Sequence, residues 1–586
     1  MMVFILLLSP MIAALALFAL PSLRGRYAVA TLLFGVLSVA ALSLFLHPEA
    51  QTFAITPGMG TLIEAADIVL LFYFLFQGVK HRSPPVLLLA LIQLPLYLWA
   101  VAITPAEAPA LVVDDLSRFM FLIINIVGGA IVLYAVEYMR REKSGEGKQR
   151  LFIAYLMLFL AVMNAIVIAD DILLFFFLFE MTTLASYLLI AFRGDAAGRR
   201  NALRALWMNQ VGGVFLLLGA LAAAYGPGSA TFSGLLQGGG GLLLPALALL
   251  AMAAPVKGAS LPFDGWLLGA MVAPTPVSAM LHSATMVKIA PFLLLKLAPG
   301  LGGTLPGTLL ALFGALVFVA ASYLALSRSL LKEILGYSTV ALLGLMMSLA
   351  AVGTPESMQL AMALMLFHAL AKALLFLAAG ALEKDFGLKD VEQMKGLLQY
   401  APRSVGFLLF GFFSLTLPPF GLFMGKLFAI ASVASLLHTQ PWFVVVLTGI
   451  AVGSALLVLL YFKIAAALLA AAPDTLPIER EMMPPGFAAP LTVLTLLSLA
   501  TAGGYMLQQH NSLLWLLALP VLIVALLPLL TRSLQRFDRV MPYRCGEKSE
   551  FDGALFYVEP SAGAAQAMQW GFGLLFAAVA LSGALI

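Results

Sequence analysis

The stretch FFFLFEMTTLASYLLIAF, residues 175–192, places one carboxylate inside an apolar run that otherwise suits the interior of a lipid bilayer. A carboxylate at the centre of a membrane helix costs about 2.5–3.5 kcal/mol on insertion scales, so it is rare without a reason. One reason is structural, with Glu180 bonded to a neighbouring helix and serving no other purpose. The other reason is functional, and this stretch alone favours neither.

The whole chain has the composition of a polytopic membrane protein. Its 586 residues are 62% hydrophobic and only 10% charged, whereas soluble domains carry about 25% charged residues. The net charge of +4 belongs to loops that face anionic lipid, and we expect no nucleic-acid partner. A single cysteine, Cys545, cannot frame a disulfide, an iron–sulfur cluster or a structural zinc site. We therefore expect no metal, cofactor or redox centre in this chain.

Apolar runs of about 20 residues are candidate membrane spans, and the sequence contains eighteen of them. Their approximate bounds are 3–22, 27–47, 62–79, 84–104, 113–136, 150–168, 171–192, 202–225, 242–258, 273–297, 303–326, 333–352, 357–381, 404–431, 440–470, 487–507, 512–531 and 566–586. The basic residues outside these spans fall in connections of one parity, which the positive-inside rule assigns to the cytoplasm. The pattern predicts a multi-pass protein of a prokaryotic cell membrane with both termini outside.

Some of the basic residues within the spans have ordinary explanations. Arg204 and Lys463 lie near inner ends and can extend toward the headgroups. Arg118 follows Asp114 by four residues, the spacing of an ion pair on a helix. Lys296 lies close to an outer end and is expected to be an interfacial anchor.

Seven ionisable residues remain well inside the spans, and packing alone does not explain them. They are Glu180, Lys257, His282, Lys288, His368, Lys372 and Lys426. Structural pairing can absorb one or two buried lysines, but only one carboxylate is obviously available for four.

Two interrupted segments resemble each other: KGASLPFDGWLLGAM (257–271) and SLTLPPFGLFMGKLF (414–428). Each places Pro and Gly inside or beside a span and carries one buried lysine, and the two spans are five apart, so they run in opposite directions. This is the pattern of an inverted-topology repeat, whose broken helices mark ion sites in transporters. Chance is the alternative, because proline is common in membrane helices. The two lysines favour the repeat.

Several motifs resemble a known family in its own order. They are FEMTTLASYLLIAF, VKGASLPFDGWLLGAMVAPTPVSAMLHSATMVK, LLKEILGYSTVALLG, FHALAKALLFLAAGAL and LPPFGLFMGK. These residues resemble the antiporter-like subunits of respiratory complex I, which have relatives in Mrp-type sodium/proton antiporters and in membrane-bound energy-converting hydrogenases. The likeness covers residues 113 to about 507.

The resemblance implies a domain organisation. A core of fourteen helices at 113–507 holds two inverted five-helix repeats, at about 150–297 and 303–470. An N-terminal region, 1–112, includes an apparent two-helix insertion at 62–104. A two-helix extension, 508–586, contains a cytoplasmic loop at 532–565.

The resemblance also implies a charged axis at mid-membrane that carries protons. Matched residue by residue, its proton-transfer groups are Glu180, Lys257, His282, His368, Lys372 and Lys426. This sequence departs from the family pattern at three places. Phe179 stands where tryptophan usually precedes the glutamate, Gly269 replaces a common aspartate for which Asp264 is a candidate substitute, and Leu364 replaces a frequent second histidine.

The assembly that the chain serves is less sharply indicated. EMTTLASYLL, ALRALWMNQVGGVFLLLGA (202–220) and PYRCGE (542–547) most resemble the large membrane subunit of Ech-type or formate-hydrogenlyase-type [NiFe] hydrogenases. That likeness implies membrane and peripheral partner subunits that carry the NiFe centre and the iron–sulfur clusters. Complex I itself, an Mrp-type antiporter that moves Na⁺ as well as protons, and an inert membrane scaffold are the alternatives.

Residue spacing supports a hydrated path. Glu180, Thr183 and Tyr187 share one helix face, as do Ser278, His282 and Thr285, and as do His368 and Lys372. In an ideal helix Lys288 points about 120° away from His282, so it is left outside the axis.

Our hypothesis for Glu180 is that it acts as a switch on Lys257. At a separation of about 7 Å and an effective dielectric constant of about 20, the two charges interact by roughly 2.4 kcal/mol. Moving one charge across about 150 mV costs roughly 3.5 kcal/mol. The interaction is therefore of the size needed to decide whether Lys257 holds a proton during pumping.

Overall fold

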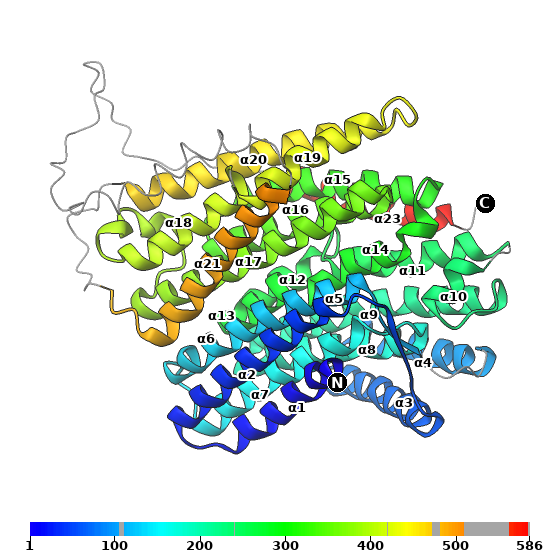
Figure 1. Ribbon diagram of the computed structural model, residues 1–586, viewed down its shortest axis with the longest axis horizontal. Helices are drawn as coiled ribbons and strands as arrows, with labels where there is room; N and C mark the ends of the chain where they lie inside the picture. Colours follow the sequence, from blue (N-terminus) through cyan, green and yellow to red (C-terminus); the bar gives the residue numbers. More distant parts are fainter. Residues whose placement is uncertain (105–109, 239–240, 419, 471–480, 509–561, 584–586) are drawn as a thin grey trace.

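The chain folds as an all-α membrane protein, which confirms the predicted fold class (Figure 1). The computed structural model describes residues 1–104, 110–238, 241–418, 420–470, 481–508 and 562–583. Within these ranges, sixteen helices are long and apolar enough to cross a membrane. Of the eighteen predicted spans, 242–258 is a shorter apolar helix, and 512–531 lies outside the described residues.

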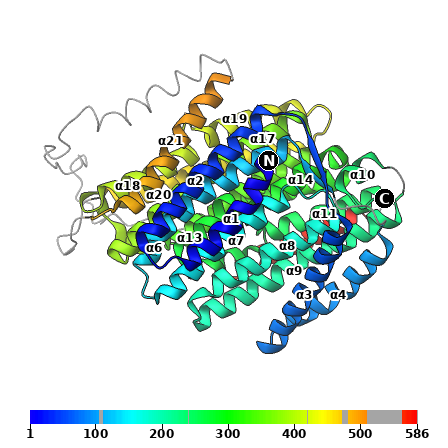
Figure 2. The ribbon, with the colours of Figure 1, turned by 60° about the horizontal axis from the view of Figure 1, so that its bottom comes forward.

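The N-terminal region contains two pairs of helices and a small ribbon of two strands. Its elements are α1 (Met2–Ala19), α2 (Leu23–Ser43), β1 (Gln51–Ala54), α3 (Pro57–Lys80), α4 (Pro84–Ile103) and β2 (Ala110–Val113). Strands β1 and β2 pair antiparallel on either side of the α3–α4 hairpin. The backbone N–H of Val112 donates to the carbonyl of Ile168 at 2.7 Å. The ribbon therefore ties the base of the hairpin to the core, while both views show the hairpin at the periphery (Figure 1, Figure 2).

The first half of the core is built around a 30-residue helix, α9. Its members are α5 (Asp115–Leu122), a π-helical turn at Ile123–Val127, α6 (Gly128–Arg140), α7 (Glu146–Ile166), α8 (Ile172–Ile190), α9 (Ala196–Tyr225), α10 (Phe232–Gln237) and α11 (Leu243–Lys257). Helix α9 packs against α4, α8 and α11. The side chain of Asp171 accepts a hydrogen bond from the N–H of Leu174 at 2.7 Å and so caps α8. These contacts fix the helix that carries Glu180.

The second half of the core surrounds α16, a helix that is buried along its whole apolar window. Its members are α12 (Asp264–Gly269), α13 (Thr275–Ala279), α14 (Ile289–Leu301), α15 (Leu305–Leu326), α16 (Leu331–Val352), α17 (Pro355–Phe386), α18 (Pro402–Thr416), α19 (Gly421–Ser435), α20 (Phe443–Leu469), α21 (Pro485–Gln508) and α23 (Ala562–Ser582). Helices α15 and α16 approach closely because both carry glycine at the crossing. A Cβ atom on Gly314 would lie 2.5 Å from the carbonyl oxygen of Gly344.

The two predicted helix interruptions are confirmed. Helix α11 ends at Lys257 and α12 begins only at Asp264, while α18 ends at Thr416 and α19 begins at Gly421. A further interruption was not predicted. Between α13 and α14 the chain forms a π-helical turn at Met280–Ala284 and a 3₁₀ turn at Met286–Lys288. Pro and Gly residues allowed the first two interruptions to be predicted, whereas the third contains neither residue.

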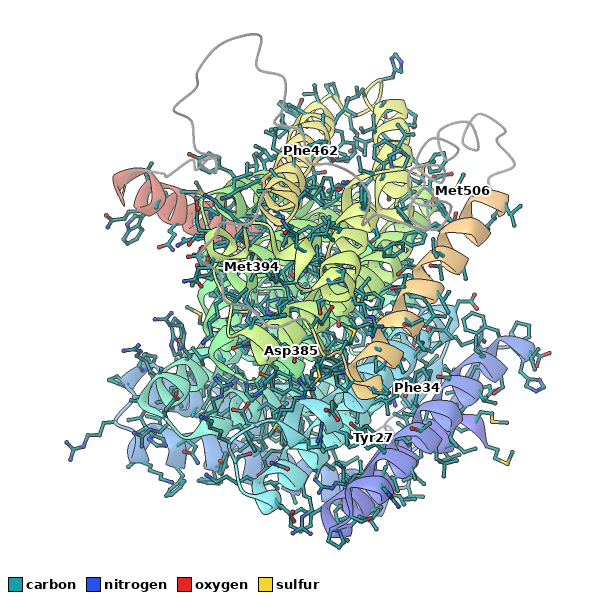
Figure 3. All side chains as sticks on the ribbon, turned by 90° about the vertical axis from the view of Figure 1, so that its left-hand side faces the viewer. Tyr27, Phe34, Asp385, Met394, Phe462 and Met506 are labelled. Carbon is teal, nitrogen blue, oxygen red and sulfur yellow. The ribbon has the colours of Figure 1, made fainter. Side chains whose placement is uncertain are left out.

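Ion pairs at one end of the bundle connect helices that are far apart in sequence. Arg141, just after α6, pairs with Asp385 at the end of α17, and Lys384 pairs with Glu142. Figure 3 labels Asp385 between the helices coloured green and those coloured cyan and blue. The two halves of the core are therefore joined by charge at this end as well as by apolar packing.

Candidate functional site

All six residues of the predicted axis are buried. Five are fully inaccessible and Lys426 is 3% exposed. They stand on five elements: the continuous helices α8 and α17, and, beside the helix interruptions, the end of α11, the π-helical turn before α14 and the beginning of α19. The residues are Glu180, Lys257, His282, His368, Lys372 and Lys426.

Glu180 is held by the α3–α4 hairpin. The side-chain amide of Gln93, on α4, donates to Glu180 Oε1 at 2.8 Å and also to the backbone carbonyl of Gln210 at 3.0 Å. The second carboxylate oxygen, Oε2, has no hydrogen-bond partner among the described residues. Gly213 makes the space, because a Cβ atom there would lie 2.0 Å from Glu180 Oε1. Gln93 was not among the predicted residues, although a single amide in the apolar run ALIQLPLYLWA was a usable signal.

The side chain of Lys257, at the end of α11, is hydrogen-bonded to α8, the helix that carries Glu180. It does not pair directly with Glu180. Its ammonium donates to the carbonyl of Phe179 and to the hydroxyl of Thr183, each at 2.9 Å. It also lies 3.7 Å from the centre of the Phe179 ring, a cation–π contact. Lys257 and Glu180 are within electrostatic range of each other but form no direct ion pair in the described part of the chain. The phenylalanine that replaces the family's tryptophan therefore contacts the lysine with both its ring and its backbone.

Lys288 belongs to the site, although the sequence prediction left it outside. Its Nζ lies 2.6 Å from Nδ1 of His368. The ideal-helix argument was wrong because the helix is not ideal at this point. The π-helical turn is followed by Thr285 with φ −122° and ψ −109° and then by the 3₁₀ turn, so the 100° step per residue does not apply. Two nitrogens at this distance share one proton, since an ammonium can donate only to an imidazole nitrogen that carries none.

His282 and Lys372 lie within electrostatic range of His368 but have different partners. These two residues, Lys288 and His368 are called the basic cluster below. Both ring nitrogens of His282 lack a hydrogen-bond partner among the described residues, and its ring packs on Phe376 with centroids 4.7 Å apart. Lys372 donates to the Leu335 carbonyl at 3.0 Å and to the Ser338 hydroxyl, rather than contacting His368 one turn away. Buried polar groups of this kind are the ones that hold internal water.

Lys426 lies in α19, shortly after the second predicted interruption. Its ammonium donates to the carbonyl of Leu415, 3.2 Å away at the end of α18. The lysine thus satisfies a carbonyl that the broken helix leaves free.

The basic cluster contains four groups and no carboxylate within the described residues. His282, Lys288, His368 and Lys372 lie within electrostatic range of one another. Because each positive charge raises the cost of the next, the cluster cannot be fully protonated. The arrangement is suited to passing protons between bases.

The hydroxyl groups of the predicted stripes are used in different ways. Tyr187 donates to Gln77 of α3 at 3.1 Å, which adds a second polar link between the hairpin and α8. Thr285 donates to the Met280 carbonyl at 2.7 Å, and the Ser278 hydroxyl has no partner among the described residues.

Three basic residues outside the axis have partners that the sequence did not predict. Arg118 pairs with Asp115, one residue beyond the predicted Asp114, because Asp114 caps α5 by accepting from the Ser117 N–H. Lys296, which was expected to be an interfacial anchor, has a side chain that is 9% exposed and pairs with Asp170 at 3.2 Å.

Lys463 also differs from the prediction. Instead of extending to the headgroups it is 7% exposed and donates to the carbonyls of Leu326 at 2.7 Å and Arg328 at 3.0 Å. Arg204 is exposed as expected.

A charged cleft of about 470 Å³ opens beside the end of α17. Its lining includes Arg204, Gly269, Lys332 and Glu383, and Lys332 and Glu383 form an ion pair. Asp264, the candidate substitute for the aspartate missing at Gly269, does not line this cleft and lies instead within electrostatic range of Arg328. The described residues contain no group of three or more His, Cys, Asp or Glu side chains that could hold a metal ion.

Two family models match the chain. Residues 169–457 match the model described as NADH:quinone oxidoreductase/Mrp antiporter, TM, and residues 108–150 match the N-terminus of complex I chain 5. An Na⁺/H⁺ antiporter subunit of Alkalihalophilus pseudofirmus is 32% identical over 336 residues, 54% of this chain and 41% of that protein. The putative antiporter subunit mnhA2 of Staphylococcus haemolyticus is 33% identical over 311 residues, 50% of this chain and 38% of that protein. The chain thus spans less than half of these curated relatives.

Two solved structures share the fold. A chain of the membrane-bound sulfane sulfur reductase, an archaeal respiratory membrane complex, superposes with a TM-score of 0.67 at 17% identity, covering 86% of this chain and 94% of that chain. A chain of the Mrp complex from Dietzia sp. superposes with a TM-score of 0.58 at 21% identity, covering 76% and 96%.

Proposed function

This chain belongs to the superfamily of antiporter-like membrane subunits shared by complex I and Mrp antiporters, and from that premise we propose that it translocates protons within a redox-driven membrane complex. The observation that carries the proposal is the set of buried basic groups, several of them beside helix interruptions, together with the buried carboxylate of Glu180. A scaffold would be more stable with apolar side chains at these positions.

The proposed path begins at Glu180 and Lys257. Movement of the Glu180 charge toward or away from Lys257 changes the free energy of holding a proton on the lysine. Thr183 and the Phe179 carbonyl keep the ammonium in place while that change occurs. A proton released from Lys257 passes to the basic cluster, where His282, Lys288, His368 and Lys372 exchange it, and then by way of Lys426 to the outside.

The complex that we propose is a membrane-bound [NiFe] hydrogenase. The support is the likeness of residues 202–220 and 542–547 to the large membrane subunit of that group; residues 542–547 lie outside the described residues. Partner subunits, both membrane and peripheral, would then hold the NiFe centre and the iron–sulfur clusters. We further propose a prokaryotic cell-membrane location with both termini outside.

The alternative function is that of an Mrp-type Na⁺/H⁺ antiporter subunit, and the observation that favours it is the identity with the curated antiporter relatives. Complex I is a third assembly compatible with the family. Purification of the native complex followed by nickel and iron analysis separates these possibilities. Nickel together with iron supports the hydrogenase, iron without nickel supports complex I, and a metal-free assembly supports the antiporter.

A further inference from the structure

Helix α3 carries a buried carboxylate that the proposed path does not use. Asp67 is fully inaccessible to solvent; neither of its oxygens makes a hydrogen bond of ordinary geometry within the described residues, and the Tyr97 hydroxyl is the hydrogen-bonding group that faces it. The Tyr97 side chain of α4 lies beside it and stacks on Phe176 of α8 with ring centroids 5.8 Å apart. Asp67 therefore lies in the interface between the α3–α4 hairpin and the helix that bears Glu180.

Polar groups of the hairpin connect Asp67 with Glu180. Gln93 and Tyr97 are four residues apart on α4, so they share a face. Gln93 is bonded to Glu180 at 2.8 Å, Tyr97 is beside Asp67, and the two carboxylates are within electrostatic range of each other. Asp67, Tyr97 and Gln93 thus place a carboxylate, a phenol and an amide of the hairpin in the same interface as Glu180.

Stability does not account for Asp67. An ionised carboxylate that no cation faces costs several kcal/mol inside a protein, and apolar replacements at such positions are often stabilising; no basic residue is among the groups that act on Asp67. The hairpin is otherwise strongly apolar, with side chains such as Leu62, Val69 and Phe72 more than half exposed at its outer surface. A buried acid in an otherwise apolar element is a candidate functional group.

We propose that Asp67 is a second proton-carrying carboxylate, which exchanges a proton with Glu180 along the face formed by Tyr97 and Gln93. In each exchange one O–H bond breaks on one carboxylic acid and one forms on the other carboxylate, so a single proton is conserved between the two groups. The hairpin then carries a required arm of the proton path, which supplies Glu180, in addition to its packing role. This inference rests on the proposed function.

The test uses the assembled complex in proteoliposomes, with proton flux driven by a potassium diffusion potential and followed with a pH-sensitive dye. Asp67→Asn should abolish most of the flux while the amount of assembled complex stays normal, and Asp67→Glu should restore part of the flux. Asp67→Leu should also abolish flux and should leave the thermal midpoint of the complex unchanged or higher. Glu64→Gln is the matched control, because Glu64 is an exposed carboxylate one turn away on the same helix, and it should behave as wild type.

Infrared difference spectra provide a second measurement that a purely structural role would not affect. The carbonyl-stretch band of the protonated acid that disappears in Asp67→Asn should shift in Glu180→Gln, because the two groups share a proton. Wild-type flux in Asp67→Asn, with flux absent in Lys257→Met, would overturn this inference and leave the proposed function standing. Wild-type flux in Lys257→Met would instead overturn the proposed function itself. Loss of assembly in Asp67→Leu would show that Asp67 is structural and would also overturn the inference.

Discussion

At the scale of single residues, Glu180 and Lys257 are coupled through one helix rather than through an ion pair. The lysine is bonded to Phe179 and Thr183, which flank Glu180 on α8, while the glutamate is bonded to Gln93 on another element. Each group can therefore change its own partner without breaking a direct bond to the other. That independence is what a switch requires and what a structural pair lacks.

The Glu180–Lys257 hypothesis predicts how substitutions combine. Glu180→Gln keeps shape and hydrogen bonding but removes the charge that stabilises a proton on Lys257, so flux should fall sharply, and Glu180→Asp should keep part of it. Lys257→Met should stop flux with little loss of expression. The double substitution should be no worse than either alone, because both disable one unit. Flux and assembled complex are measured in the same vesicles. A structural pair gives the opposite pattern, with expression lost in each single variant and restored in the double.

Two lysines eight residues apart should show opposite defects. Lys288 lies against His368 in the basic cluster, so Lys288→Met should abolish most of the flux while assembly stays normal, as should Lys372→Ala. Lys296 pairs with buried Asp170. Lys296→Met removes the charged partner of this buried carboxylate and should therefore destabilise the protein by about 3–5 kcal/mol. Immunoblots of membranes give the amount of assembled complex. Normal assembly of Lys296→Met or normal flux of Lys288→Met would contradict these assignments.

The burial of the six axis residues could be predicted because an apolar run leaves a charged side chain no exposure to water. Their partners could not, since backbone carbonyls and amides on other helices leave little trace in sequence. Lys288 shows the limit most clearly. Its direction was inferred from a uniform 100° step per residue, and the interruption at Thr285 changes that direction without any proline or glycine to signal it.

At the scale of elements, proline and glycine predicted the two helix interruptions near Lys257 and Lys426. The sequence did not predict where two helices approach each other closely. Glycines occur throughout the chain, and only the packed structure shows which of them meet another backbone. Gly314 is one, facing the Gly344 carbonyl where α15 crosses α16. Residues 62–104 could be predicted to form two spans, but the contribution of Gln93 to the site could not be predicted.

The α15–α16 crossing gives a prediction about stability. Gly314→Ala places a Cβ atom 2.5 Å from the Gly344 carbonyl and 2.7 Å from the Ser348 N–H, so it should destabilise the protein by about 1–3 kcal/mol through overpacking. Gly35→Ala is the matched control, because nothing lies within 4 Å of a Cβ atom there and alanine is the better helix former. The thermal midpoint in detergent should fall for the first variant and stay equal or rise for the second. Equal midpoints for both would mean that the crossing can relax.

At the scale of the whole molecule, the number of spans could be predicted from hydropathy, while their direction stays a prediction from the distribution of basic residues. The structure describes sixteen long helices and the shorter α11 within its ranges, in agreement with the run of apolar segments. Hydropathy cannot show which helices touch, and the ion pairs that join α6 and α17 near Asp385 were not expected. Those pairs depend on helices distant in sequence meeting at one end of the bundle.

Cys545 tests the direction of the spans, although it lies outside the described residues. It stands among Arg532, Arg536, Arg539 and Arg544 in the loop that we assign to the cytoplasm. An impermeant thiol reagent should label it in inside-out vesicles or opened cells and not in intact cells. Cys545→Ser removes the label and should leave flux intact, since a lone thiol has no disulfide or metal partner in this chain. Labelling of intact cells would reverse the orientation.

The glycine at 213 has a consequence for the evolutionary history of this chain. A Cβ atom at that position would lie 2.0 Å from Glu180 Oε1 and 2.4 Å from Gln93 Nε2, so the hydrogen bond between these two side chains keeps its present geometry only with glycine there. Across homologous sequences, a glycine matching Gly213 should therefore be inherited together with a polar residue matching Gln93. Homologues without the two extra helices should be free to carry larger residues at both places.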